Sequence, residues 1–174
     1  MAKGGIISAI HQGSLAEELE LVPGDKIISI NEQELTDIID LSFALADEEI
    51  EIIIEHENGE QEIIAFEKDM DEELGAEFES AVFGKIRQCA NNCYFCFVDQ
   101  VAPNMRDSLY IKDDDYRLSF LYGNFVTMTN MGPRDLERIH RLHLSPLYIS
   151  VHTTNPKLRG EMLRTKRGEL IMEQ

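Results

Sequence analysis

All three cysteines of this 174-residue chain lie in one short stretch, from Cys89 to Cys96. Three residues separate Cys89 from Cys93, and two separate Cys93 from Cys96. A disulfide framework normally uses an even number of cysteines spread over the fold, so this cluster indicates a metal centre instead. Three thiolates on one loop can bind a single inorganic centre and leave one coordination position vacant, which is typical of a reactive site rather than a purely structural one.

The residues around the cysteines extend the pattern. Phe95 directly precedes the last cysteine, and Cys-x3-Cys-x2-Cys with an aromatic residue at this place resembles the signature of the radical SAM enzymes. One subfamily joins a PDZ-like domain to a radical SAM domain, followed by a C-terminal domain of unknown function. Its resemblance to this chain rests on Arg87-Gln88-Cys89, Cys96 to Gln100, Asp113 to Arg117 and Tyr122 to Phe125.

The resemblance implies a cofactor set and a reaction. Cys89, Cys93 and Cys96 would ligate three irons of a 4Fe-4S cluster, S-adenosyl-L-methionine would chelate the fourth iron, and Phe95 would pack at the cluster and adenine edge. A flavodoxin-like or ferredoxin-like electron donor would supply one electron. The bound S-adenosylmethionine would then break to give a 5′-deoxyadenosyl radical, which abstracts hydrogen from a substrate that the sequence does not identify.

Two other interpretations stay open. The thiolates could hold a structural zinc ion of the Cys3His type, with His140 or His143 as the fourth ligand. The chain would then be a PDZ-type peptide-binding or scaffold module with a structural zinc or an inactive cysteine site. A zinc-stabilised domain predicts a colourless protein that unfolds with chelator, whereas a peptide-binding module needs no metal.

The composition is that of a globular protein, since 43% of the residues are hydrophobic and 28% are charged. The net charge of −17 repels phosphate groups and argues against a nucleic acid or an anionic membrane surface as the partner. No stretch approaches the roughly 20 apolar residues that a membrane span needs. We therefore expect a cytoplasmic protein, in a reducing compartment that suits an oxygen-sensitive cluster.

The expected fold class is α/β overall, beginning with a small PDZ-like α+β domain over residues 1–79. The segments Gly4 to Ala16 and Pro23 to Asn31 resemble a PDZ domain of the bacterial, permuted kind. Ser14 and Thr36 are expected to cap two helices, and Asn58-Gly59 predicts a type I′ hairpin turn. The expected strands cover 5–10, 26–30, 49–57 and 60–68, and the expected helices cover 15–19 and 37–46.

A PDZ domain binds an extended peptide by adding a strand beside a carboxylate-binding loop. A permuted version would supply this loop and groove from Leu74, Gly75 and Phe78. The acidic residues Glu72 and Glu73 beside them disfavour a carboxylate ligand. The alternative is a docking or scaffold domain that packs on the enzyme.

Residues 80–174 are expected to form the N-terminal part of a parallel (β/α) radical SAM barrel. Alternating strands and helices with short connections predict a parallel sheet with right-handed crossovers. The family's partial barrel needs more strand–helix units than this segment holds, so the chain is expected to be a truncated or split version of a longer protein. The expected strands cover 81–87, 125–130 and 147–152, and the expected helices cover 116–122, 134–142 and the residues from 157 onward.

Radical SAM enzymes usually carry Gly-Gly-Glu at the end of the second strand, where it holds the amino group of the methionine moiety. This chain has Thr129 and Asn130 at that place, so their side chains are the acceptors expected for the cofactor. Ser150 and His152 are expected on one face of the third strand, as contacts to substrate or cofactor. The basic residues of segment 157–167 could contact a cofactor carboxylate or an anionic substrate, although a solvated helix face is the favoured interpretation. The three aspartates of 113–115 could form a divalent cation site, but they are expected to complement a helix dipole.

Overall fold

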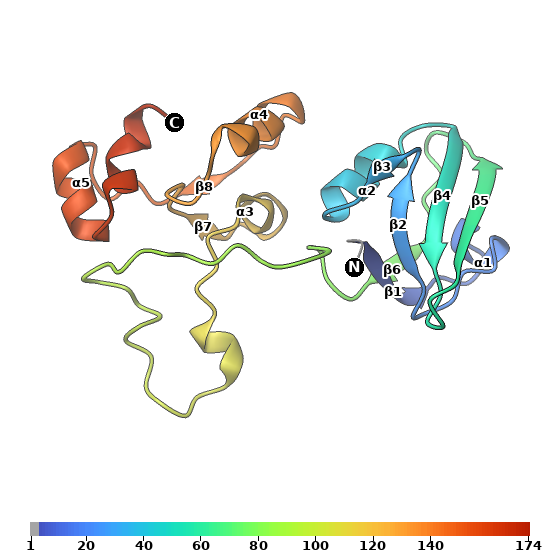
Figure 1. Cartoon of the computed structure of the whole chain (residues 1–174), viewed down its shortest axis with the longest axis horizontal. Helices are drawn as coiled ribbons and strands as arrows, with labels where there is room; N and C mark the ends of the chain where they lie inside the picture. The colour runs from blue at the N-terminus through green and yellow to red at the C-terminus, as the bar shows by residue number, and fades with distance from the viewer. Residues whose placement is uncertain (1–3) are drawn as a thin grey trace. The chain divides into compact units, whose positions relative to one another are not determined.

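The computed structural model describes residues 4–174 and divides into two compact units, the first ending at Lys85 and the second beginning at Ile86 (Figure 1). The boundary expected after residue 79 precedes this division. Phe83 belongs to the hydrophobic core of the first unit, and its ring lies 5.4 Å from that of Phe78. The neighbouring Val82 is buried and pairs with Asp37 of the same unit. The segment after residue 79 therefore folds with the first unit.

The first unit is built on an antiparallel sheet whose strands follow the order β5-β4-β2-β1-β6, with β3 paired to β2. β6 and β5 are the edges of this order. Two short helices complete the unit. The elements are β1 (Gly5–Ile10), α1 (Leu15–Glu18), β2 (Lys26–Ile30), β3 (Gln33–Glu34), α2 (Ile38–Ala44), β4 (Glu49–Glu55), β5 (Gln61–Glu67) and β6 (Ala76–Phe78).

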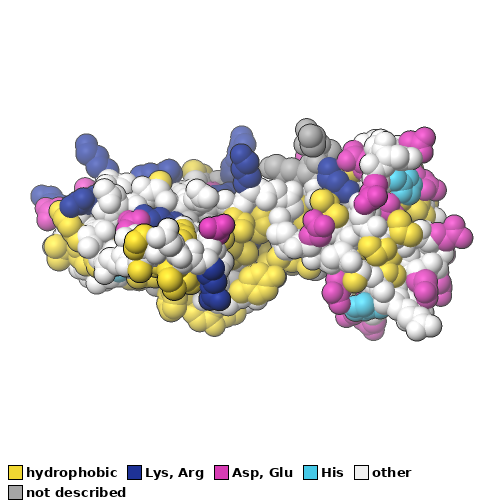
Figure 2. Space-filling view, turned by 90° about the horizontal axis from the view of Figure 1, so that it is seen from below, with side chains coloured by type: hydrophobic (Ala, Val, Ile, Leu, Met, Phe, Trp, Pro, Cys, Tyr) yellow, Lys and Arg dark blue, Asp and Glu magenta, His cyan; other side chains and the backbone are white. Residues whose placement is uncertain are grey.

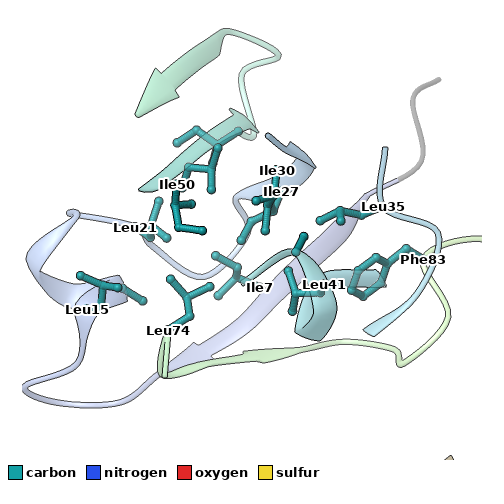
Figure 3. Close-up of a cluster of buried hydrophobic side chains, with 14 residues drawn as sticks. Ile7, Leu15, Leu21, Ile27, Ile30, Leu35, Leu41, Ile50, Leu74 and Phe83 are labelled. Carbon is teal, nitrogen blue, oxygen red and sulfur yellow. The ribbon is translucent and has the colours of Figure 1, made fainter. Parts of the chain in front are cut away.

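The core of the first unit follows from the period of two in its strands. In β4, Ile50, Ile52 and Ile54 are buried, whereas Glu49 and Glu51, on the other face of the strand, are exposed. Figure 3 shows the buried side chains of β1, β2 and β4 meeting those of the helices and of the segment before β6. Burying one large aliphatic side chain stabilises a fold by about 1.5–3 kcal/mol, so this shared core holds the sheet together.

The helix caps of the first unit are local hydrogen-bond arrangements. Ser14 caps α1, as predicted, and its hydroxyl accepts from the N–H of Glu17. The prediction that Thr36 caps the next helix is wrong. Asp37 is the N-cap of α2, because its carboxylate accepts from the first-turn N–H groups at 3.0 and 3.1 Å. The hydroxyl of Thr36 donates instead to Asp40 at 2.6 Å.

The hairpin of β4 and β5 forms as expected, but its turn differs from the expected type I′. A type I′ turn needs positive φ at both central residues, and of Asn58 and Gly59 only Gly59 has it, at 84°. The N–H of Gly59 donates to the carbonyl of His56 at 2.8 Å, and the N–H of His56 donates to the carbonyl of Glu60. The connection is therefore a three-residue loop that ends with glycine in the left-handed region.

The second unit contains two paired strands, which are parallel, with Phe125 opposite Tyr148 and Val126 opposite Ile149. Asp115 caps α3 and Asn155 caps α5, each through its side-chain oxygen. Pro133 opens α4 at a position where its missing N–H costs nothing. The elements are η1 (Asp107–Tyr110), α3 (Tyr116–Tyr122), β7 (Phe125–Val126), α4 (Pro133–Arg141), β8 (Tyr148–Ile149), α5 (Pro156–Leu163) and η2 (Lys166–Met172).

The three strands expected over residues 80–174 are shorter than predicted or do not form. Segment 81–87 is not a strand: it contains one isolated bridge at Val82, and the next bridge follows at Gln88, which pairs with Asp113 of the second unit. β7 ends at Val126, since Met128 has a φ of 63°. β8 ends at Ile149, so residues 150 and 152 do not alternate on a strand face as expected.

The two units differ in surface character. Acidic side chains are spread over the first unit, whereas hydrophobic and basic side chains are prominent on the second unit in the face shown (Figure 2). The most exposed large hydrophobic side chains of the second unit are aromatic: Phe97, Phe125, Tyr94 and Tyr122. Within residues 4–174, no helix has the length and apolar character needed to cross a membrane.

Candidate metal centre

The cysteine loop, residues 89–96, has no regular secondary structure, and backbone hydrogen bonds hold it at its start and in its middle. The N–H of Cys89 donates to the carbonyl of Lys112 at 2.7 Å. The N–H groups of Asn92 and Tyr94 donate at 3.3 and 3.4 Å to the last two carbonyls of α5, which lack partners within the helix. The guanidinium of Arg164 lies 4.2 Å from the centre of the Tyr94 ring. The path of the loop therefore depends on α5.

All three cysteines open onto one pocket of about 380 Å³. Phe95 and Ser150, both expected near the cofactor, line the same pocket. One part of the lining is apolar and consists of Phe95, Phe97, Val98, Ile111 and Phe125. The polar part consists of Lys112, Asp113, Asp114, Asn124, Thr127 and Ser150. The pocket thus joins three thiols to a hydrophobic wall and to charged groups of both signs.

The thiols lie in a partly buried setting that favours their neutral form. Burial raises the pKa of Cys89 and of Cys93, and the neighbouring thiols raise the two values further. Near the thiol of Cys96, the carboxylate of Asp99 accepts from Lys112 Nζ at 2.6 Å. This bond from Lys112 holds the pKa of Asp99 below its usual value. A thiolate ligand must lose its proton, so metal binding here would release protons.

A network of buried polar side chains lies next to the pocket. Asn91, between the first two cysteines, donates through Nδ2 to Thr127 Oγ1 at 3.0 Å and accepts through Oδ1 from Thr129 Oγ1 at 2.9 Å. Asp114 accepts from the N–H and the hydroxyl of Thr127 at 2.6 and 2.7 Å. Burial raises the pKa of Asp114, and the two bonds from Thr127 oppose this effect. The network links the cysteine loop to the end of β7.

Thr129 and Asn130, the acceptors expected for the cofactor, do not line the pocket but contact two residues that do, Asp114 and Thr127. Asn130 Nδ2 donates to the carbonyls of Asp114 and Gln88 at 2.8 and 3.3 Å. Its Oδ1 is buried, and within residues 4–174 it is the one buried side-chain oxygen or nitrogen that lacks a hydrogen-bond partner. Asn130 therefore carries an unused acceptor close to the pocket.

The prediction of a solvated basic helix face over 157–167 is wrong for Arg159. Its side chain is 0% exposed, and its guanidinium donates four hydrogen bonds, all to backbone carbonyls. They reach Thr127 and Gly168 at 2.8 Å, Val151 at 2.9 Å and Ser150 at 3.0 Å. One side chain thus ties together the segments that follow β7 and β8 and the turn of η2.

The residue two positions before Cys89, Arg87, is fixed at several points. Its N–H donates to Asp115 at 2.9 Å. Its guanidinium forms a two-point ion pair with Asp135, in which Nη1 donates to Oδ2 at 2.8 Å and Nη2 donates to Oδ1. Its charge also lies 5.3 Å from the centre of the Tyr116 ring. Although burial raises the pKa of Asp135, the bonds from Arg87 hold it below its usual value. The segment that leads into the cysteine loop is therefore rigidly placed.

His152 contacts the aromatic residue of the signature. Its ring lies 5.1 Å from the ring of Phe95, and its backbone has a φ of 62°. Partial burial and the charge of Arg159 lower the pKa of His152. The backbone N–H of Ser150 donates to the carbonyl of Val126 at 2.8 Å. Ser150 and His152 are thus both near the pocket, although they do not share a strand face.

The three residues expected for a peptide groove lie in the first unit. Leu74 is buried in its core, and Phe78 packs on Phe83. Gly75 has a φ of 72°, and a Cβ at this position would lie 2.2 Å from the Cβ of Ser14. Only glycine therefore fits at the start of β6.

The donor set of the pocket fits an iron–sulfur cluster. No group of three or more His, Cys, Asp or Glu side chains among residues 4–174 is arranged around one metal ion. In a 4Fe-4S cluster each thiolate binds a different iron, so the ligands need to share a pocket rather than to meet at one point. Cys89, Cys93 and Cys96 share such a pocket. His140 and His143, considered as zinc ligands, are not part of its lining.

Sequence reasoning did not identify Asn91, Asp114 or Arg159 as parts of this site. The position of Asn91 between two predicted ligands was a signal, but nothing local shows that its side chain turns inward. The run of three aspartates before α3 indicates a helix-dipole role for all of them, although only Asp115 caps α3. Arg159 gave no signal, because its four acceptors are backbone carbonyls of other segments.

Comparison with known proteins matches each part of the chain to a protein family. A family model described as Radical SAM-like domain matches residues 68–174, which is more than half of the chain, and a model described as PDZ domain matches residues 6–55. A search of curated proteins finds no match. The radical SAM-like match includes the cysteine loop, α3, β7, α4, β8 and α5.

Proposed function

This chain belongs to the radical SAM-like family, with a PDZ domain at its N-terminal side, and we propose that it binds a 4Fe-4S cluster and S-adenosylmethionine and cleaves the latter reductively. The observation that carries the proposal is the pocket shared by Cys89, Cys93 and Cys96. These are all the cysteines of the chain, in the spacing of the family signature.

The roles of the protein residues follow from their positions. The three thiolates would hold the cluster at three irons, and Phe95 would cover one side of it, supported by the ring of His152. When bound, the cluster supplies the electron that breaks a sulfonium bond of S-adenosylmethionine and yields a 5′-deoxyadenosyl radical. The apolar wall of the pocket would exclude water from this site. The free Oδ1 of Asn130 could accept from the ammonium group of the cofactor, in place of the family's glutamate.

The surrounding fold and the partners are also proposals. We propose that β7, α4, β8 and α5 are successive units of a partial parallel (β/α) barrel, since β7 and β8 pair in parallel across α4. Catalytic groups of such barrels collect at the C-terminal ends of the strands, and Thr127 and Ser150 follow those ends directly. The electron would come from a small flavodoxin-like or ferredoxin-like protein.

A test of the reaction is the formation of 5′-deoxyadenosine. The 174-residue chain would be incubated anaerobically with iron and sulfide, desalted, and supplied with dithionite and S-adenosylmethionine. We expect 5′-deoxyadenosine in the wild-type reaction and none in Cys93→Ala. A wild-type chain that carries the cluster but forms no product would contradict the proposed reaction, and a chain that takes up no iron would contradict the proposed cofactor.

A second function is favoured by the PDZ match and by the place of β6 at the edge of the sheet. PDZ domains bind extended peptides by adding a strand to a sheet edge. We propose that the first unit contacts a protein or peptide partner through β6. Fluorescence anisotropy with C-terminal peptides tests this: saturable binding is expected, and no binding to the folded wild-type chain would contradict the proposal.

A further inference from the structure

Asn91 is the buried residue of the cysteine loop. It is 6% exposed, while every other non-cysteine residue from Ala90 to Phe95 is exposed. It stands between two of the thiols, so any shift of its backbone also moves Cys89 and Cys93. Its side chain makes hydrogen bonds to Thr127 and Thr129, 36 and 38 residues away in the sequence. A buried amide in an otherwise exposed loop is a strong restraint, because opening the loop would leave its polar groups and their partners unpaired.

The hydrogen bonds of this network run in one direction. A carboxylate can only accept, so the Thr127 hydroxyl donates its hydrogen bond to Asp114. The oxygen of that hydroxyl then accepts from Nδ2 of Asn91. The remaining oxygen of Asn91 accepts from the hydroxyl of Thr129. The buried carboxylate of Asp114 thereby orients the amide of Asn91, and each group has a partner.

We propose that Asn91 is a positioning residue, which holds Cys89 and Cys93 at the pocket through Thr127, Thr129 and Asp114 before any cofactor binds. The proposal rests on the proposed function only in taking a cluster as the occupant of the pocket. The restraint itself belongs to the chain without metal, where Asn91 keeps the loop on the end of β7. The backbone bonds of Asn92 and Tyr94 to α5 restrain the other side of the same loop.

Four variants separate this role from a general effect on the loop. Asn91→Ala removes the amide, and Asn92→Ala is the matched control, since Asn92 is the adjacent asparagine and is exposed. Asn91→Asp places a second carboxylate on the Thr127 hydroxyl, which has only one proton to give. The double variant Asn91→Asp with Asp114→Asn conserves charge and reverses the network. Thr127 and Thr129 would then donate to residue 91, and the new amide at position 114 would donate to Thr127.

The measurement is the rate of alkylation of each cysteine in the metal-free chain, with iodoacetamide as the probe and peptide mass spectrometry as the readout. We expect Asn91→Ala to raise the rates of Cys89 and Cys93 roughly tenfold, because two hydrogen bonds that close the loop are lost. Asn91→Asp should act in the same direction, Asn92→Ala should match the wild type, and the double variant should return both rates to within about twofold of it. Equal rates in Asn91→Ala and Asn92→Ala would overturn the proposal.

A second readout on the same variants separates this proposal from the proposed function. After anaerobic incubation with iron and sulfide, we expect Asn91→Ala to hold less iron and to give an altered electron paramagnetic resonance spectrum, both restored in the double variant. A wild-type chain without iron, combined with the expected alkylation rates, would refute the cluster and leave the positioning role intact. If Asn91→Ala unfolds, the double variant becomes the test of the proposal. A folded double variant whose Cys89 and Cys93 still react faster than in the wild type would overturn it.

Discussion

Replacing Arg159 by methionine should lower the free energy of unfolding of the second unit by about 4 kcal/mol. The guanidinium is 0% exposed and donates four hydrogen bonds to backbone carbonyls over 2.8–3.0 Å. Methionine has a similar length but offers no donor, so the four hydrogen bonds from the guanidinium are lost, although the Val151 carbonyl keeps the bond from the N–H of Thr153. At about 1 kcal/mol per hydrogen bond the loss is about 4 kcal/mol, a large part of the roughly 5–15 kcal/mol by which a typical domain is stable.

Urea unfolding followed by tyrosine fluorescence measures this loss in the second unit alone. All five tyrosines lie after residue 85, and the chain has no tryptophan. Lys157→Met is the matched control, because Lys157 is an exposed cation on the same helix, and it should change the free energy of unfolding by less than about 0.5 kcal/mol. Arg159→Lys keeps the charge but not the planar guanidinium with its several donors. Its free energy of unfolding should therefore lie between those of Arg159→Met and Lys157→Met.

The reasoning would be refuted if Arg159→Met and Lys157→Met unfolded at the same urea concentration with the same slope. In that case the four carbonyls must find water or other donors at no net cost, and Arg159 would not be the residue that ties the ends of β7 and β8. A large loss of unfolding free energy in both variants would indicate that α5 tolerates no substitution, rather than that the hydrogen bonds of Arg159 matter.

Three further predictions concern the first unit. His56 Nδ1 lies 2.8 Å from Asp25, and this bond raises the pKa of His56 above its ordinary 6.5. Protonated His56 therefore stabilises the folded unit fully below pH 6.5, and this stabilisation is lost as the pH rises through the higher pKa of the folded state. Thermal melts from pH 5 to 9 should show the corresponding decline in melting temperature. The variant His56→Gln should abolish this pH-dependent decline. Asp37→Ala should cost about 1–2 kcal/mol, since two first-turn N–H groups lose their cap, and urea unfolding followed by circular dichroism would measure it. Gly75→Ala should lower the melting temperature markedly, because its Cβ would lie 2.2 Å from Ser14, whereas Gly13→Ala, with open space around it, should have a smaller effect.

The parts of the fold that the sequence predicts are those with local signals. Ser14 marks the start of α1, and Asn155 and Pro156 mark that of α5, because caps act within three or four residues. The alternating isoleucines of β4 and the glycine of the following turn place the hairpin correctly, although the type of turn depends on the φ of Asn58, which asparagine does not fix.

The parts that sequence reasoning missed depend on distant partners. Segment 81–87 is rich in apolar residues, but its neighbours supply one isolated bridge rather than a ladder, so no strand forms. His152 was expected on a strand that ends three residues earlier. In the site, the three cysteines are predicted from their spacing, whereas Asn91 and Arg159 depend on hydrogen-bond partners far away in the chain. Residue type and spacing therefore identify the expected ligands, and long-range hydrogen bonds identify what would hold them in place.

The central claim is that Cys89, Cys93 and Cys96 together hold one iron–sulfur cluster. Its most direct test is the iron content of the 174-residue chain after anaerobic incubation with iron and sulfide and removal of unbound metal. We predict about four irons per chain with broad visible absorption, and loss of both in Cys89→Ala, Cys93→Ala and Cys96→Ala. A colourless wild-type chain with a single zinc ion, or iron content that the three substitutions do not change, would contradict the claim.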